Sequence, residues 1–186
     1  MRPVERSEIV DYETYGDRRD GIRAQALAAK RLRRYLVGEF LCFLFENRET
    51  VRYQVQEMMR TERIVREEDI LHEIQTYNEL LGTDGELGCT LLIGIPDEAA
   101  REERLPRWMG LNDTLYMRLP DGTKVRPRYD SRQVGRGRLS SVQYLHFALG
   151  GVVPVAIGCD HSDPELTTEL PLSADQQAAL ASDLAG

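Results

Sequence analysis

Residues 45–81 show a helical periodicity that constrains the fold of this chain more than any other feature. Asn47 can accept main-chain hydrogen bonds as the cap of a first helix, and Gly82 and Gly85 follow a second helix that starts near Glu67. The apolar positions recur at intervals of three and four residues: Val51, Val55, Met58, Met59, Ile70, Ile74, Tyr77 and Leu81. The pattern predicts a pair of amphipathic helices, each with one apolar side.

Apolar runs on both sides of this pair predict strands. The short aromatic run at 39–47 is apolar on both faces, and residues 86–96 alternate until Pro96 ends them. Asp121-Gly122 lies between two alternating runs and predicts a β-hairpin. Residues 140–149 and 152–161 predict two further strands.

Three more helices are expected outside the pair. The alanine-rich residues 21–36 form the first, with an exit at Gly38. Residues 97–110 form the second, which Pro106 should break or kink, and Ser173 caps the third at the C-terminal end. Residues 1–20 have little periodicity and predict an irregular lead-in.

These elements predict an α+β fold, with residues 21–186 as a single domain. We expect a curved, mostly antiparallel sheet of about six strands, with the helical pair and the terminal helices packed against it. Regular alternation of strands and helices is absent from the pattern, which disfavours a doubly wound nucleotide-binding sheet.

Composition narrows the functional classes. With 186 residues, a net charge of −7 and no apolar run of about 18 residues, the chain is expected to be globular and to lack a membrane span. The negative charge argues against general nucleic-acid binding. The N-terminal residues lack the apolar core of a secretory signal, and Cys42, Cys89 and Cys159 form no paired framework. We expect a cytoplasmic protein with reduced, mostly buried thiols.

Positive charge gathers in one segment. Residues 118–138 carry seven basic side chains against Asp121 and Asp130, whereas no Lys or Arg follows Gly150. Guanidinium groups bind carboxylates and phosphates in bidentate geometry. Candidate side chains for binding a partner or an anion are Arg48, Arg52, Arg126, Arg128, Arg136 and Arg138.

A metal site is an alternative. His72-Glu73 resembles a zinc-protease helix, but Thr76 stands where the second histidine ligand is needed. Asp69 and His72 have the spacing of one of the two motifs that a di-iron site requires. The alternative interpretation is that these residues lie on a solvated face of the helix. Cys159, Asp160 and His161 come just after a strand and offer three types of metal ligand. The alternative interpretation of Asp160 is that it is a turn residue. The candidate ligands for iron or zinc are His161, Asp160, His72 and Glu57. Ser140, Ser141, His146 and Asp160 would suit nucleophilic catalysis, but no nucleophile elbow surrounds either serine.

Four ordered segments carry a family resemblance. They are FENRETVRYQVQEMMRTERI, IQTYNELL, SSVQYLHFAL and GCDHSDP with the final helix. From Val10 onward the chain resembles the uncharacterised bacterial family called domain of unknown function 3501. The resemblance implies an accessory role in redox or oxidative-stress metabolism, beside rubrerythrin-like di-iron or iron-sulfur oxidoreductases. The family has no established reaction, so the resemblance transfers no catalytic residue. Family members often have histidine at the position of Gln143 and arginine at that of His146, and this departure argues against shared histidine chemistry on this strand.

The leading expectation is a non-catalytic accessory protein that docks to such a redox partner. The polar face of residues 46–79 and the basic segment 126–138 would form the docking surface. A small metal-binding protein or metal-dependent enzyme, and an arginine-lined module for an anionic small molecule, are the alternatives. Tyr53 and Tyr77 are candidate exposed aromatics that could also pair two copies of the chain.

Overall fold

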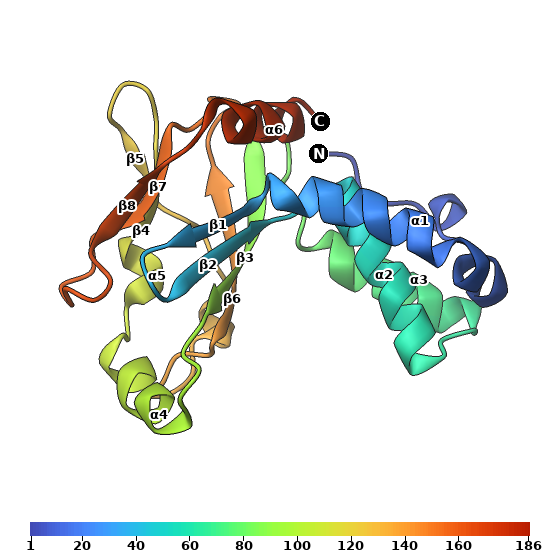
Figure 1. The fold of residues 1–186 in the computed structure, drawn as a ribbon, viewed down its shortest axis with the longest axis horizontal. Coiled ribbons are helices and arrows are strands. Elements are labelled where there is room, and N and C mark those ends of the chain that lie inside the picture. Colours follow the sequence, from blue (N-terminus) through green and yellow to red (C-terminus); the bar gives the residue numbers. More distant parts are fainter.

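Three helices lie together on one side of the molecule, as the computed structural model of residues 1–186 shows (Figure 1). Asp11 and Asn47 cap the first two of them through side-chain oxygens that accept main-chain N–H groups. These helices are α1 (Tyr12–Arg31), α2 (Arg48–Glu62) and α3 (Glu67–Asn78). A small core of eight buried residues is formed by α2, α3, the N-terminal residues Val4 and Ile9, and Leu81, and Val55 of α2 is fully buried in it. We call this part the helical lobe.

The first helix differs from the expectation at both ends. Because Asp11 accepts hydrogen bonds from Glu13 and Thr14, the helix begins at Tyr12, and the irregular lead-in covers only residues 1–11. The helix ends at Arg31, and the next residues form strand β1 (Arg34–Val37) instead of a further helical turn. Tyr35 and Val37 point into the core there, since alternate residues of a strand face opposite sides.

Four strands form the sheet nearest the helical lobe, which we call sheet A. Its order is β1-β2-β3-β6, and all neighbours are antiparallel. The other members are β2 (Leu41–Phe45), β3 (Glu86–Ile93) and β6 (Val142–Ala148). All three coincide with predicted strands.

Four further strands form sheet B, with the order β5-β4-β7-β8. The expected hairpin joins the first two, and its Gly122 has a φ of 89°, which favours glycine. The strands are β4 (Leu115–Arg118), β5 (Lys124–Val125), β7 (Ala156–Cys159) and β8 (Thr168–Pro171). β8 was not predicted, because it is short and alternates between exposed and half-buried residues. The strands therefore number eight and form two sheets.

The two sheets and the helices that cover them form a second part, which we call the β lobe. The main hydrophobic core lies within it. It contains 26 buried residues from both sheets and from the helices that cover them, including Trp108 and Phe147. The covering helices are α4 (Glu98–Arg107), the short α5 (Leu111–Thr114) and α6 (Ala174–Ala185). Ser173 caps α6 as predicted. Pro106 does not break α4 at Leu105, because it lies in the last turn and the Trp108 amide still reaches the Arg104 carbonyl.

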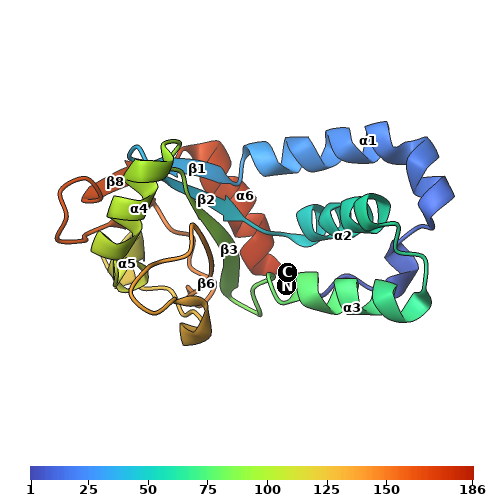
Figure 2. The same cartoon turned by 90° about the horizontal axis from the view of Figure 1, so that it is seen from below.

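The helical pair stands beside the sheets instead of covering them (Figure 2). The two lobes join at three points, where α1 leads to β1, β2 leads to α2 and α3 leads to β3. A buried ion pair lies at this joint, where the Arg33 guanidinium donates to both Asp183 carboxylate oxygens at 2.6 and 2.8 Å. The two chain ends lie close together in both views (Figure 1, Figure 2). None of the helices combines the length and apolar character needed to cross a bilayer.

Candidate binding cleft between the lobes

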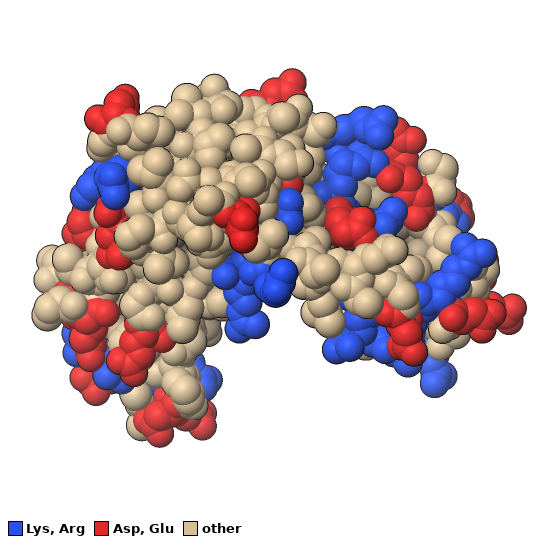
Figure 3. Space-filling view, turned by 45° about the horizontal axis from the view of Figure 1, so that its top comes forward, with Lys and Arg blue, Asp and Glu red and all other residues tan.

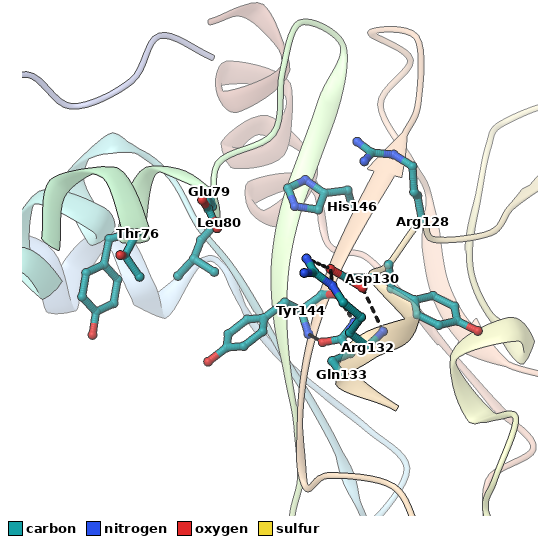
Figure 4. Close-up of a pocket in the computed structure, with 11 residues that line it drawn as sticks. Thr76, Glu79, Leu80, Arg128, Asp130, Arg132, Gln133, Tyr144 and His146 are labelled. Carbon is teal, nitrogen blue, oxygen red and sulfur yellow. Dashed lines mark hydrogen bonds and ion pairs between the residues drawn. The ribbon is translucent and has the colours of Figure 1, made fainter. Parts of the chain in front are cut away.

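A cleft of about 860 Å³ lies between the helical lobe and sheet A (Figure 4). Three segments line it: the C-terminal part of α3, the loop that precedes β6, and β6 itself. The lining residues are Thr76, Tyr77, Glu79, Leu80, Arg128, Tyr129, Asp130, Arg132, Gln133, Tyr144 and His146. A cleft of this size is typical of ligand-binding sites.

Strand β6 is an edge strand whose outer main-chain groups are covered locally. Arg128 and His146 exchange main-chain hydrogen bonds of 2.7 and 2.9 Å. The Gln133 side chain bonds both the amide and the carbonyl of Tyr144, at 2.7 and 2.8 Å. These contacts prevent a further strand from pairing with the outer edge of β6, and they hold the side chains of β6 that face the cleft in place.

The opposite wall is held by close main-chain packing. A methyl group on Gly88 of β3 would overlap the main-chain oxygen of Leu80, just beyond the end of α3. The absence of a side chain at Gly88 therefore lets the end of α3 lie directly against sheet A, which places Leu80 on the rim of the cleft.

His146 presents an unused polar atom at the cleft. Its Nδ1 is buried and has no hydrogen-bond partner. Burial lowers the pKa of His146, and the nearby Arg128 guanidinium lowers it further. The imidazole is consequently neutral at neutral pH, and its Nδ1 is covered from solvent, so a ligand reaches this atom only when the surrounding groups move.

The arginines of the cleft are only loosely engaged. The exposed Arg128 guanidinium lies 3.2 and 3.3 Å from the Glu86 carboxylate, which also accepts a 2.6 Å bond from the Thr83 hydroxyl. Arg132 pairs with Asp130 on the open surface. Exposed pairs of this kind contribute little to stability, so both guanidinium groups can be redirected to a ligand.

The outer face of sheet A continues the cleft. We define this face as two rows of side chains aligned across the strands by the register: Leu36, Cys42, Leu92 and Val142, and beside them Arg34, Leu44, Thr90 and Tyr144. The side chains of Leu36, Val142 and Tyr144 are 61, 37 and 47% exposed. The molecule is hollowed between its two lobes, with Lys and Arg side chains on both sides of the hollow (Figure 3).

The four candidate metal ligands lie apart. Glu57 is in the helical lobe, where it accepts hydrogen bonds from Tyr15 and Arg19, and His72 lies on the exposed side of α3. Asp160 lies beyond β7 and is held by Lys124 and Arg126. His161 is buried in the next turn, where its Nδ1 accepts the Asp163 amide at 3.0 Å. The structure contains no group of three or more His, Cys, Asp or Glu side chains arranged to hold a metal ion.

Neighbouring arginine side chains keep two of these carboxylates ionised. The Arg19 guanidinium lowers the pKa of Glu57 to about 2, and Arg126 lowers that of Asp160 to about 2. Each carboxylate therefore already has a hydrogen-bonded arginine partner within its own lobe. Asp160 is likewise not brought to His146, because one follows sheet B and the other lies on sheet A.

The predicted arginine set separates into three groups. Arg48 binds Glu8, Arg52 binds Glu49 and Arg126 binds Asp160, so these three guanidinium groups are engaged within the molecule. Arg128 lines the cleft. Arg136 and Arg138 are exposed in the loop before β6 and pair with no carboxylate. The arginines that stay candidates for binding a partner or an anion are Arg128, Arg136 and Arg138.

The aromatic and cysteine expectations have mixed outcomes. Tyr53 is buried, with Lys30 above its ring at 5.3 Å, so it is not an exposed aromatic, whereas the half-buried Tyr77 lines the cleft. All three cysteines are free and buried, as predicted. Burial raises the pKa of Cys159.

Gln143 and His146 face opposite sides of β6. Gln143 is fully buried, accepts a 2.9 Å bond from Asn112 and donates at 2.8 Å to the Ser140 carbonyl. His146 faces the cleft instead. Sequence reasoning missed Tyr144, although the alternation of SSVQYLHFAL already places it on the same side as His146.

Fold and cleft together define a two-lobed α+β protein with an open interlobe binding surface. A family model described as "Protein of unknown function (DUF3501)" matches residues 3–184. The chain therefore belongs to the DUF3501 family.

A solved structure supports this assignment. It is the crystal structure of a protein of unknown function from Burkholderia pseudomallei, with 30% sequence identity and a TM-score of 0.87. The match covers 98% of this chain and 100% of that protein. No curated protein matches the chain.

Proposed function

We propose that this protein is a non-catalytic, cytoplasmic accessory protein that binds a partner protein in the interlobe cleft. The observation that carries the proposal is the cleft itself, which lies between two separately packed lobes and presents exposed Tyr144 beside the loosely engaged Arg128. Tyrosine and arginine are enriched at the centres of protein interfaces.

The polar groups of the cleft favour recognition over catalysis. Arg128, Arg132 and Asp130 each have a partner of opposite charge that can be exchanged for one on another molecule. His146, Glu79 and Asp130 are the candidate bases in the cleft, and no serine or cysteine lines the cleft beside them as a nucleophile. The arrangement suits binding and orientation of a segment from outside.

An oxidoreductase with a di-iron or iron-sulfur centre is the proposed class of partner. This part of the proposal rests on the family resemblance, which implies a role beside rubrerythrin-like and iron-sulfur proteins. The three buried thiols are inaccessible, so electron transfer would remain with the partner. The protein would stabilise or position that partner.

Affinity capture from a native extract tests the proposal. The wild-type protein is compared with a cleft variant, Tyr144→Ser combined with Arg128→Ala, and with a control on the far side of the helical lobe, Tyr12→Ser combined with Arg23→Ala. Tyr12 and Arg23 are exposed on α1 and make no side-chain hydrogen bond or ion pair.

Quantitative mass spectrometry identifies the captured proteins. We expect an iron-containing oxidoreductase to be enriched by the wild type and the control but lost, by about tenfold or more, from the cleft variant. Equal capture by all three would place the interface elsewhere. Enrichment of only unrelated proteins would reject the redox class.

Binding of an anionic small molecule is the second candidate, favoured by the unpartnered Nδ1 of His146 close to Arg128. A small-molecule ligand would raise the melting temperature in proportion to its concentration over Kd. A thermal-shift screen of aromatic carboxylates and phosphates, run at low and high salt, checks this. A salt-sensitive rise that disappears in Arg128→Ala is the expected result for this candidate, and a flat screen would reject it.

A further inference from the structure

We infer that the surface formed by the cleft and the outer face of sheet A binds an acidic segment that carries aliphatic side chains. This inference rests on the proposed function, since it names the chemistry of the partner. It draws on two independent features of the surface: an apolar row whose two ends are exposed and a set of uncompensated arginines.

The apolar row is set by the strand register. Leu36, Cys42, Leu92 and Val142 are aligned across all four strands of sheet A. The two end members, Leu36 on β1 and Val142 on β6, leave 61 and 37% of their surface in solvent. Between them Cys42 is buried and Leu92 is half-buried. Apolar surface at both ends of one row, unlike a single exposed leucine, indicates a surface that a partner covers.

The second row joins this strip to the cleft. Tyr144 belongs both to the outer face and to the cleft lining, and its register partner across β3 is Thr90. His146 follows two residues later on the same side of β6. A single bound segment can therefore contact the apolar row, Tyr144 and the cleft together.

The unpaired charges of the surface predict the net charge of the bound segment. Arg34 lies at the β1 end of the second row and contacts only the Cys42 sulfur, at 3.4 Å. Arg136 and Arg138, shortly before Val142, have no carboxylate partner. Glu79 is the one carboxylate of the cleft lining without an ion pair. Glu46, whose carboxylate accepts a 3.4 Å hydrogen bond from Thr90 of the second row, also has no ion pair. The three unpaired arginines outnumber these two carboxylates, and this excess of positive charge in a protein of net charge −7 favours an acidic ligand.

Selection from a random library of 12-residue peptides displayed on phage tests the inference without assuming a sequence. The immobilised full chain is the target, and the double variant Leu36→Glu with Val142→Glu is the counter-target. A matched control is Val65→Glu with Leu27→Glu, because these residues are 71 and 46% exposed on the helical lobe.

We expect the enriched peptides to carry net negative charge together with Leu, Ile or Val. Their affinity, measured by fluorescence anisotropy of synthetic copies, should fall at least tenfold in the double variant and remain unchanged in the control. Raising NaCl from 50 to 300 mM should weaken binding severalfold, as expected for exposed charges.

Several outcomes would overturn the inference. They are enrichment of neutral or basic peptides, equal binding to the double variant, or no enrichment at all. Stable self-association that Leu36→Glu abolishes would assign the face to a second copy, and cosedimentation with vesicles of phosphatidylserine and phosphatidylcholine would assign it to a lipid surface. If the inference fails while the cleft-dependent capture succeeds, the proposed function stands and only the chemistry of the segment is wrong.

Discussion

His146 is the residue whose environment departs most from its sequence context. It stands on a strand edge, yet its Nδ1 is buried without a partner, and its pKa is lowered by burial and by Arg128, while Glu86 opposes this shift. A neutral imidazole with a free nitrogen is suited to recognise a hydrogen-bonding group of a ligand. The binding surface therefore has a fixed, uncharged polar group between its arginines.

This environment predicts a pH-dependent stability. The pKa of His146 in the folded state lies below its value of 6.5 in the unfolded chain, so the unfolded state takes up a proton first as the pH falls. The stabilising contribution is complete above pH 6.5 and decreases below it. We expect the free energy of unfolding, measured by urea titration at pH 7.5 and 5.5, to fall less in His146→Gln than in the wild type. An identical pH dependence would contradict the neutral state of His146.

The Arg33–Asp183 pair gives a second prediction at the level of single residues. Both side chains are largely buried, so removing one charge leaves the other unpaired inside the protein. Asp183→Ala should lower the free energy of unfolding by about 3 kcal/mol. Glu103→Ala, which removes an exposed pair with Arg107, serves as the control and should cause no measurable change. Similar losses in both variants would show that burial does not distinguish them.

Glycine packing determines how the α3 end meets sheet A. An added methyl group at Gly88 would overlap the Leu80 carbonyl, whereas at Gly94 it would lie 3.8 Å from the Phe40 oxygen, in ordinary contact. Gly88→Ala should therefore cost about 2 kcal/mol or more, as overpacking does. Gly94→Ala should be nearly neutral or slightly stabilising. Thermal unfolding of the two variants checks this, and equal melting temperatures would contradict the close approach of α3 to β3.

Local patterns predicted most elements of this fold. The caps at Asn47 and Ser173, the hairpin at Asp121-Gly122 and the alternation of β3 and β6 all act within a few residues, so sequence alone reveals them. β1 was taken for helix because strong helix formers precede it. β8 gains its strand conformation from pairing with β7, which no local pattern shows.

The candidate site was only partly predictable. Arg128, Arg136 and Arg138 were identified from charge density alone; Arg128 lines the cleft, and Arg136 and Arg138 are exposed in the loop before β6. Tyr144 was missed because a tyrosine on a strand is usually read as packing. The cleft is created by the position of α3 relative to β6, two elements more than 60 residues apart, and periodicity contains no information on that contact.

At the scale of the whole molecule, two cores of unequal size support the cleft. The β lobe contains 26 clustered core residues and the helical lobe eight. Because buried apolar contacts determine local stability, we expect amides of α1–α3 to exchange with deuterium faster than those of β2 and β3. Hydrogen-exchange mass spectrometry of the free protein measures this. Uniform protection would indicate that the lobes unfold as one cooperative unit.

Unequal lobes joined at three chain crossings can also adjust the width of the cleft on binding. The joint is fixed by Arg33 and Asp183, whereas the cleft rim depends on the weak contacts of Arg128 and Arg132. This division places rigidity at the joint and exchangeable contacts at the surface that receives the partner. It is the arrangement expected of a protein whose role is recognition.

Hydrogen exchange of the protein bound to its captured partner tests the central claim most directly. The account predicts new protection in peptides that cover 76–80, 128–133 and 142–146, and none on the exposed side of α1. Protection centred on sheet B or on α1, with these three segments unchanged, would contradict the assignment of the interlobe cleft as the binding site.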